Sequence, residues 1–108
     1  MAMYGEYFTA YKAYRSKYGE RTFLLYQVGA FFEVYAKKSD EETYDAIKIY
    51  SEICDLAIAH KQNGVYMAGF RDFLLEKYIE KIHPHGYTVV VCYQEECPAE
   101  KTKKFIRK

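Results

Sequence analysis

The stretch QVGAFFEVY, residues 27–35, holds the side chains whose types and spacing are most distinctive in this sequence. Successive side chains of a strand point to opposite faces, so Phe31 and Glu33 would share one face while Phe32 and Val34 share the other. A plain hairpin strand with one buried face is the structural interpretation. An aromatic ring beside a carboxylate on the outer face is unusual for a plain hairpin, but by itself this pattern makes a binding role for Phe31 only the minor alternative.

Basic side chains elsewhere are candidates for contacts with phosphate groups. Lys37 and Lys38 follow the same strand directly, and Lys61 occurs later in the chain. A further basic run near the end of the sequence consists of Lys101, Lys103, Lys104, Arg107 and Lys108. Such a run is most often a solvated segment, and phosphate binding is the minor alternative.

Neither a catalytic nor a metal-binding pattern is found. The sequence has no Ser-His-Asp order with a nucleophile-elbow glycine pattern and no carboxylate pair in an obvious cleft. The candidate metal ligands are His83, His85, Cys92 and Cys97. Their spacing fits the usual zinc sites poorly. We therefore predict no catalytic residue, no metal and no cofactor in this chain.

Phe31 is expected at the start of the second strand of a β-hairpin. Residues 22–28 and residues 31–36 are both rich in β-forming side chains and of strand length. Only Gly29 and Ala30 separate them. We therefore expect an antiparallel hairpin in which Gly29 adopts an unusual backbone angle.

Three helices are expected around this hairpin. Residues 4–18 place aromatic side chains at steps of three and four, which predicts a helix with one aromatic stripe. A second helix over residues 40–54 has Ser39 as its N-cap and acidic residues in its first turn. A third, over residues 71–83, carries apolar side chains on one face and ends at Pro84.

Two further strands complete the expected order. Residues 56–61 predict a strand, and residues 65–70 lead into the third helix. Residues 87–94 include three consecutive valines, a pattern typical of a strand buried on both faces. The order of helix, strand, strand, helix, strand, helix and strand predicts a mixed α/β fold, in which about three helices flank a small mixed β-sheet.

Length and composition indicate one folded domain. The chain has 108 residues, 19% of them aromatic, which supports one core over residues 1–98. Residues 99–108 are expected to be a basic tail, either a strand start or a linker to a following domain. The formal net charge of +1 is too small for nucleic-acid binding through phosphate contacts alone.

Membrane association is not expected, and the cysteine content bears on location. No apolar run is long enough to span a bilayer, and the amino terminus lacks the order of a signal peptide. The sequence holds 3 cysteines, and this odd, sparse set favours a reducing, intracellular compartment.

Several segments in order carry a family resemblance: a Tyr-rich leading helix, LLYQVGAFFEVY, CDLAIAHK, GVYMAGF, EKYIEKI and GYTVVVCYQEECP. Together they resemble the amino-terminal, mismatch-recognition domain of the MutS family of DNA mismatch-repair proteins. The hairpin is the most specific element, because its family pattern is G-D-F-x-E followed by an apolar residue and an aromatic. The residues in those places are Gly29, Phe31, Glu33, Val34 and Tyr35.

This resemblance implies that the chain binds double-stranded DNA with mismatches or small loops. It implies that Phe31 stacks on a mispaired base from the minor-groove side and that Glu33 hydrogen-bonds the same base. Together with the turn glycine and the basic candidates, the expected DNA-binding residues are Phe31, Glu33, Gly29, Lys37, Lys38 and Lys61. The protein is accordingly expected to be intracellular and associated with DNA.

The resemblance also implies parts that this sequence lacks. MutS proteins are clamps whose ATPase domain carries a P-loop, and the pattern G-x-x-x-x-G-K-[ST] is absent here. We expect the chain to be the first domain of a longer parent protein that forms a dimeric clamp, binds ATP and Mg, and contacts downstream mismatch-repair proteins. The chain by itself is expected not to be an enzyme.

Two departures from the family pattern leave an alternative open. Ala30 stands where the family has an acidic residue. After Met67-Ala68-Gly69 the family continues with a proline and a Tyr-His pair, whereas this chain has Phe70, Arg71, Asp72 and Phe73. These changes leave Phe31 and Glu33 in place. They support a rival interpretation, in which the domain is retained as a structural or protein-interaction module that does not read mismatches.

Overall fold

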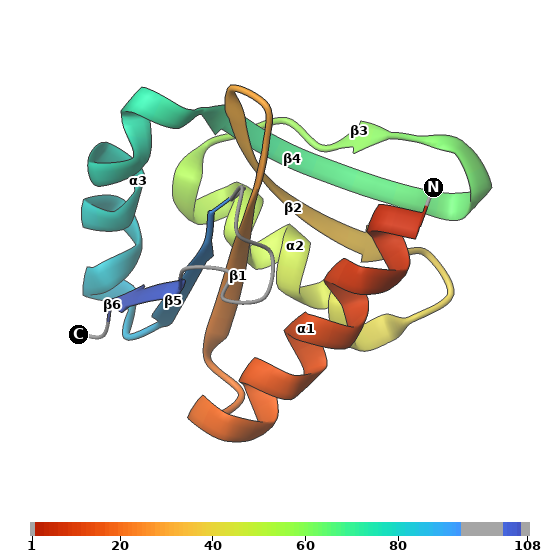
Figure 1. Ribbon diagram of the computed structural model, residues 1–108, viewed down its shortest axis with the longest axis horizontal. Helices are drawn as coiled ribbons and strands as arrows, with labels where there is room; N and C mark the ends of the chain where they lie inside the picture. The colour runs from red at the N-terminus through yellow and green to blue at the C-terminus, as the bar shows by residue number, and fades with distance from the viewer. Residues whose placement is uncertain (1, 94–102, 107–108) are drawn as a thin grey trace.

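The computed structural model of the chain describes residues 2–93 and 103–106. Its α-helices are α1 (Ala2–Tyr18), α2 (Glu41–Cys54) and α3 (Leu75–Ile82). Its strands are β1 (Thr22–Val28), β2 (Phe31–Lys37), β3 (Ala59–His60), β4 (Val65–Arg71), β5 (Thr88–Cys92) and β6 (Lys103–Ile106). Three short 3-10 turns, η1 (Gln62–Gly64), η2 (Asp72–Leu74) and η3 (His83–His85), connect some of these elements (Figure 1).

The strands within the described residues form one twisted six-stranded sheet in the order β3-β4-β2-β1-β5-β6. The β1–β5 pair is parallel, and the other neighbouring pairs are antiparallel. The sheet is therefore mixed, and with its flanking helices it confirms the predicted mixed α/β fold class. Strand β2, which carries Phe31, lies between β1 and β4, so a neighbouring strand supports it on each edge.

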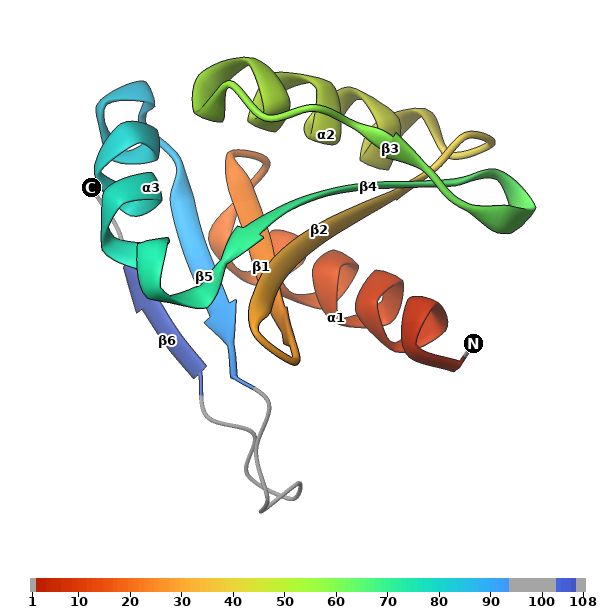
Figure 2. The ribbon, with the colours of Figure 1, turned by 90° about the horizontal axis from the view of Figure 1, so that it is seen from above.

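Helix α1 covers one face of the sheet with the aromatic stripe that the sequence predicted. Tyr7 and Tyr11 are 1% and 4% exposed. The Tyr7 hydroxyl donates a hydrogen bond of 2.9 Å to the backbone carbonyl of Leu24 in β1, and so attaches the helix to the sheet. In Figure 2, α1 lies on the side of β1 and β2 away from α2.

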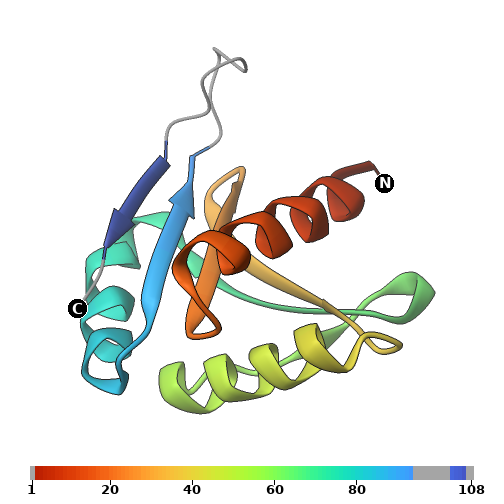
Figure 3. The same ribbon diagram turned by 90° about the horizontal axis from the view of Figure 1, so that it is seen from below.

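Helices α2 and α3 pack on the opposite face of the sheet, where the main core forms (Figure 3). Phe23 of β1 meets Tyr50 of α2 with ring centroids 5.4 Å apart, and Phe70 of β4 stacks on Tyr78 of α3 at 4.4 Å. The three consecutive valines of β5 are fully buried, as expected of a strand covered on both faces.

Several boundaries differ from the sequence predictions. The N-cap of α2 is Asp40 and not Ser39, because the Asp40 side chain accepts a hydrogen bond from the Glu42 N–H. The strand predicted over residues 56–61 is reduced to Ala59–His60, because α2 ends in a left-handed turn at Asp55 and β3 is an edge strand.

The predicted order omitted one strand and left a second one open as an alternative. Residues 65–70 had been interpreted as a connection, but residues 65–71 form β4, which pairs along the whole of β2. Lys103–Ile106 forms β6, so the strand alternative for the basic tail is the one found. The remaining tail residues 99–102, 107 and 108 lie outside the described residues, and the predicted domain boundary at residue 98 stays a prediction.

Candidate nucleic-acid interface

The β1–β2 turn presents the predicted binding side chains at one end of the sheet. Val28 pairs with Phe31 across the hairpin, so Gly29 and Ala30 form a two-residue turn. Gly29 has a φ of 61°, the left-handed value that a turn of this type requires at its first position and that glycine adopts without steric cost. The predicted hairpin and its unusual glycine are thus confirmed. A second support comes from Asp72, whose backbone N–H donates a 2.8 Å hydrogen bond to the Ala30 carbonyl.

The two adjacent phenylalanines have opposite environments. Phe32 is 2% exposed and packs near Phe70 in the core, whereas Phe31 is 40% exposed. The alternation predicted for β2 is therefore confirmed, and Phe31 is the ring left at the surface. Its role in binding DNA stays a prediction at this point.

An open groove of about 290 Å³ lies beside Phe31, with Glu33 in its lining. The other lining residues come from the β3 edge and from β4: Ala57, Ala59, Met67, Ala68 and Gly69. Gly69 is directly opposite Glu33 in the β2–β4 register. A Cβ atom at Gly69 would stand 2.7 Å from the Phe32 carbonyl oxygen and 3.0 Å from Glu33 Cγ, so the absence of a side chain there leaves room for the glutamate.

The Glu33 carboxylate is held in place from within the sheet. The Tyr35 hydroxyl donates a hydrogen bond to Glu33 Oε1. Burial, and then this hydrogen bond, raise the pKa of Tyr35 well above its ordinary value, so the hydroxyl remains a donor. The Tyr35 ring is itself fixed by edge-on contacts with Tyr4 and Tyr7 of α1, at centroid distances of 4.9 and 5.1 Å.

The predicted lysines lie at the other end of β2. Lys37 ends this seven-residue strand, which places it about 20 Å from Phe31 at roughly 3.3 Å per residue. Its ammonium stands 5.4 Å from the Phe8 ring. The Lys38 backbone N–H donates a 2.8 Å hydrogen bond to the Gly64 carbonyl. The Lys61 backbone N–H donates a 2.7 Å hydrogen bond to the carbonyl of the neighbouring Val65. The structure thus brings the three lysines to one end of the sheet and does not bring them to Phe31.

Arg71 and Phe73 are surface residues beside Phe31 that the sequence analysis did not select. Arg71 pairs with Phe31 in the β2–β4 register, and its guanidinium carbon lies 5.3 Å from the Phe31 ring centroid. Phe73 is 74% exposed. The signal in the sequence was the departure from the family pattern at residues 70–73, but only the long β4 strand shows that this departure lies next to Phe31.

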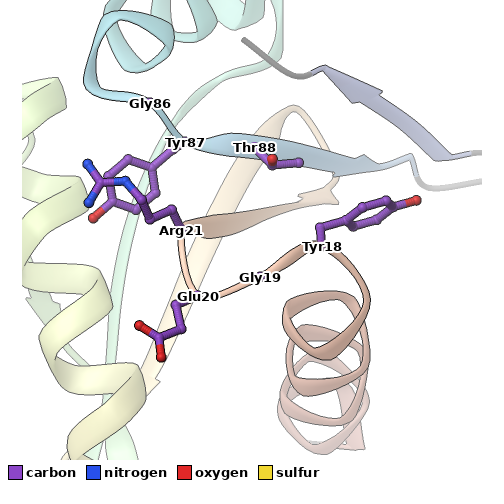
Figure 4. Close-up of a pocket in the computed structure, with 7 residues that line it drawn as sticks. All are labelled: Tyr18, Gly19, Glu20, Arg21, Gly86, Tyr87 and Thr88. Atoms are coloured by element: carbon purple, nitrogen blue, oxygen red, sulfur yellow. The ribbon is translucent and has the colours of Figure 1, made fainter.

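The other candidate sites carry little chemistry. Among the described residues no group of three or more His, Cys, Asp and Glu side chains could hold a metal ion, and Cys97 lies outside them. A hollow of about 530 Å³ lies between the α1–β1 connection and the start of β5 (Figure 4). Its Arg21 donates a 2.7 Å hydrogen bond to the His85 carbonyl and lies over the Tyr87 ring, so this side chain joins two connections.

Within the described residues, no helix is long and apolar enough to cross a membrane.

Comparison with known proteins gives consistent results. Residues 6–108 match the family model described as MutS domain I. A DNA mismatch repair protein MutS from Nostoc punctiforme is 35% identical over 89 residues, which cover 79% of this chain and 9% of that protein. The MutS of Lactobacillus delbrueckii subsp. bulgaricus is 33% identical over 90 residues, covering 80% of this chain and 10% of that protein. The MutS of Thermotoga maritima is 32% identical over 85 residues, covering 79% and 10%. The chain thus spans about a tenth of the length of these relatives.

Proposed function

Because the chain belongs to the MutS family, as a domain I, we propose that it binds mismatched DNA by inserting Phe31 from the minor groove at a mispaired or unpaired base. The observation that carries this proposal is the pair of Phe31 and Glu33 on one open groove at a braced hairpin turn. The exposed Phe31 ring can enter a base step without disturbing the core that Phe32 completes.

The physical basis of discrimination is the cost of opening a base step. Unstacking a matched step costs a few kcal/mol, and a mispaired or looped-out base is less firmly held, so an apolar wedge enters there more easily. A phenyl ring suits every base because each base has a π-face. The wedge therefore senses weak pairing and not one particular base.

Glu33 supplies the second part of the discrimination. A carboxylate near the phosphate backbone is repelled by it, so its presence is tolerated only where it gains a specific hydrogen bond from a base. Tyr35 donates to Oε1 of Glu33, and Glu33 lines the groove. Glu33 thus penalises loose binding to matched DNA and contributes to binding at an opened step.

Lys37, Lys38 and Lys61 are proposed as phosphate contacts at a distance from the wedge. The separation of about 20 Å along β2 corresponds to about six base pairs at roughly 3.4 Å per pair. A duplex that receives Phe31 could therefore meet the lysines only at another part of its backbone. With a formal net charge of +1, this chain would supply only a minor share of the phosphate contacts.

We assign no catalytic step to this chain. Its relatives are about ten times longer, and we propose that it acts within a parent protein of that kind. The parent would be a dimeric, DNA-associated, intracellular clamp that binds ATP and Mg through a domain outside this chain and contacts downstream mismatch-repair proteins.

One observation favours a second candidate function. The turn has Ala30 in place of the acidic residue of the family pattern, and residues 70–73 beside it also depart from that pattern. A structural or protein-interaction module that no longer reads mismatches would show changes of this kind at the same end of the sheet.

The deciding experiment measures binding of the protein at its natural length to a duplex with one G·T mismatch and to its matched twin, by fluorescence anisotropy at one salt concentration. Base stacking on an aromatic ring contributes about 1–3 kcal/mol, so Phe31→Ala is expected to weaken mismatch binding roughly 5- to 140-fold. Weak binding to the matched duplex should be unchanged, which removes the preference.

Two controls accompany this measurement. Ile49→Ala removes an apolar side chain of α2 that is 40% exposed, the same fraction as Phe31, and should leave the preference intact. Phe31→Tyr keeps a ring and should retain most of the preference. A preference that survives Phe31→Ala, or that the wild type lacks, would favour the interaction module.

A further inference from the structure

Arg71, Phe31 and Phe73 form a small surface cluster at the hairpin turn, called here the Arg71 cluster. The Arg71 guanidinium carbon lies 5.3 Å from the centroid of Phe31 and 5.8 Å from that of Phe73. The two rings are 40% and 74% exposed, and Arg71 is itself exposed. The cluster therefore combines one cation with two accessible apolar surfaces.

The fold does not account for this arrangement. No ion pair of Arg71 is found among the described residues, although Asp72 is its direct neighbour. Cation–π contacts at exposed sites contribute little to stability, and a ring as exposed as Phe73 gains little from folding. Exposed aromatic side chains next to a planar cation are instead typical of binding surfaces.

A guanidinium beside two rings can keep its hydrogen-bonding edge for a further partner. Rings interact with the faces of the guanidinium plane, whereas its N–H donors lie in that plane. A guanidinium held in this way is oriented before it binds, so it loses less freedom on contacting a phosphate. The 2.8 Å hydrogen bond from Asp72 N–H to the Ala30 carbonyl fixes the end of β4 against the turn that presents Phe31.

The local charge balance also points to an anion. Glu33 places a negative charge in the groove beside Phe31. Lys37 lies about 20 Å away along β2, with Lys38 and Lys61 at the same end of the sheet, and this distance exceeds the Debye length of about 8–10 Å in physiological salt. These lysines are therefore screened from the turn, and Arg71 is placed to offset the repulsion between Glu33 and the DNA backbone.

We propose that Arg71 binds a backbone phosphate of the DNA strand next to the base step that Phe31 enters, with Phe73 orienting its guanidinium. Arg71 is thus a phosphate-binding residue beside the Phe31 ring, and this inference rests on the proposed function. Under this inference, residues 70–73 take part in DNA binding. The rival interpretation instead explains their departure from the family pattern as a loss of mismatch reading.

The test compares Arg71→Gln with wild type in the protein at its natural length, on the matched and the G·T duplex, between about 50 and 200 mM salt. Loss of one phosphate contact reduces the slope of log K against log salt by about 0.9 on both duplexes. The ratio of wild-type to variant affinity should accordingly fall about 3.5-fold across that salt range. The preference for the mismatch should change little.

Three further variants separate the causes. Lys48 is a matched control, because its ammonium lies 5.0 Å from the Tyr44 ring centroid but on α2, which covers the opposite face of the sheet. Lys48→Gln should therefore leave the salt slope unchanged. Arg71→Lys keeps the charge and should restore the slope, which also gives a readout if Arg71→Gln does not fold. Phe73→Ala removes no charge and should weaken binding to both duplexes about two- to fivefold at an unchanged slope.

The outcomes distinguish this inference from the proposed function. A wild-type salt slope in Arg71→Gln, or an equal reduction of the slope in Lys48→Gln, would overturn the phosphate contact. If Phe31→Ala still abolished the mismatch preference, the proposed wedge would remain supported. A reduced slope in Arg71→Gln combined with a preference that survives Phe31→Ala would support the phosphate contact and overturn the wedge.

Discussion

Tyr35 links the aromatic stripe of α1 to the carboxylate that faces the groove. Its ring lies among Tyr4 and Tyr7, and its hydroxyl donates to Glu33 Oε1. Glutamate has three side-chain torsions, and a donor that fixes its oxygen removes most of their freedom. The orientation of Glu33 is therefore prepared by a residue that lies in the core and does not itself reach the groove surface.

Removal of this one hydroxyl tests its role. Tyr35→Phe keeps the ring and its packing, so Glu33 remains but can change rotamer. Ordering such a side chain on binding costs about 0.5–1.5 kcal/mol, so the mismatch preference should fall about two- to tenfold. Tyr4→Phe deletes a hydroxyl from the same aromatic group without touching Glu33, and should not change the preference. Equal preferences for Tyr35→Phe and wild type in the anisotropy assay would show that Glu33 needs no such support.

The pairing of β2 with β4 determines the surroundings of Phe31 and Glu33. Seven consecutive pairs join the two strands, from Phe31 with Arg71 to Lys37 with Val65. At Glu33 the partner is Gly69, where any side chain would meet the backbone of Phe32. The glycine is therefore required by the close approach of the two strands and not by its backbone angle.

A side chain at Gly69 should disturb both stability and recognition. Gly69→Ala places a Cβ 2.7 Å from the Phe32 carbonyl oxygen, and overpacking of this kind costs about 1–3 kcal/mol of the free energy of unfolding. Urea denaturation measures this loss. Gly5→Ala on α1 makes the same chemical change where nothing lies within 4 Å, and should stabilise the protein by about 0.5–1 kcal/mol. A neutral Gly69→Ala would mean that β2 and β4 can separate slightly without loss.

Local signals made the hairpin predictable. The spacing of Gly29 and Ala30 between two β-forming segments determines the turn, and the period of two in a strand determines which phenylalanine is exposed. These features depend only on residues 22–36. The mixed fold class followed from the order of such segments, and the family resemblance, which is confirmed, identified Phe31 and Glu33 as the residues of interest.

Features that depend on distant residues were predicted less well. Val65–Arg71 forms a full strand because β2 lies beside it, and the glycine within it lowered its β-propensity in isolation. The register that sets Arg71 opposite Phe31 joins residues far apart in the chain, so no local pattern contains it. Asp40 and Ser39 are both good N-caps, and only the backbone geometry of the folded turn selects Asp40.

Buried tyrosines make the whole molecule sensitive to alkaline pH. Burial is the largest cause that raises the pKa of six tyrosines above the ordinary 10.0, and the pKa of Tyr11 rises to about 12. The six are Tyr7, Tyr11, Tyr14, Tyr26, Tyr35 and Tyr50. Below pH 10 these groups are protonated in both the folded and the unfolded chain, so they do not make stability depend on pH. Above it, the unfolded chain loses protons that the folded chain retains, which favours unfolding.

The free energy of unfolding should therefore fall as pH rises above about 10, by up to roughly 1.4 kcal/mol per pH unit for each such tyrosine. Urea midpoints measured from about pH 9 to about pH 11 test this expectation. Tyr11→Phe removes one of the groups and should make the decline less steep. A midpoint that stays constant over this range would mean that these hydroxyls ionise equally well in the folded protein.

The alternation along β2 also bears on how such a domain can change over evolutionary time. Phe31, Glu33 and Tyr35 occupy one face of the strand, and Phe32, Val34 and Ala36 the other. Substitutions at Phe31 and Glu33 alter the exposed part of the first face, while Tyr35 and the second face keep the core intact. A single inserted or deleted residue within β2 would instead exchange the two faces, placing a carboxylate in the core and the core phenylalanine in the groove. Related sequences can therefore vary the exposed side chains of this face one by one, but the two different environments of β2 keep its length constant.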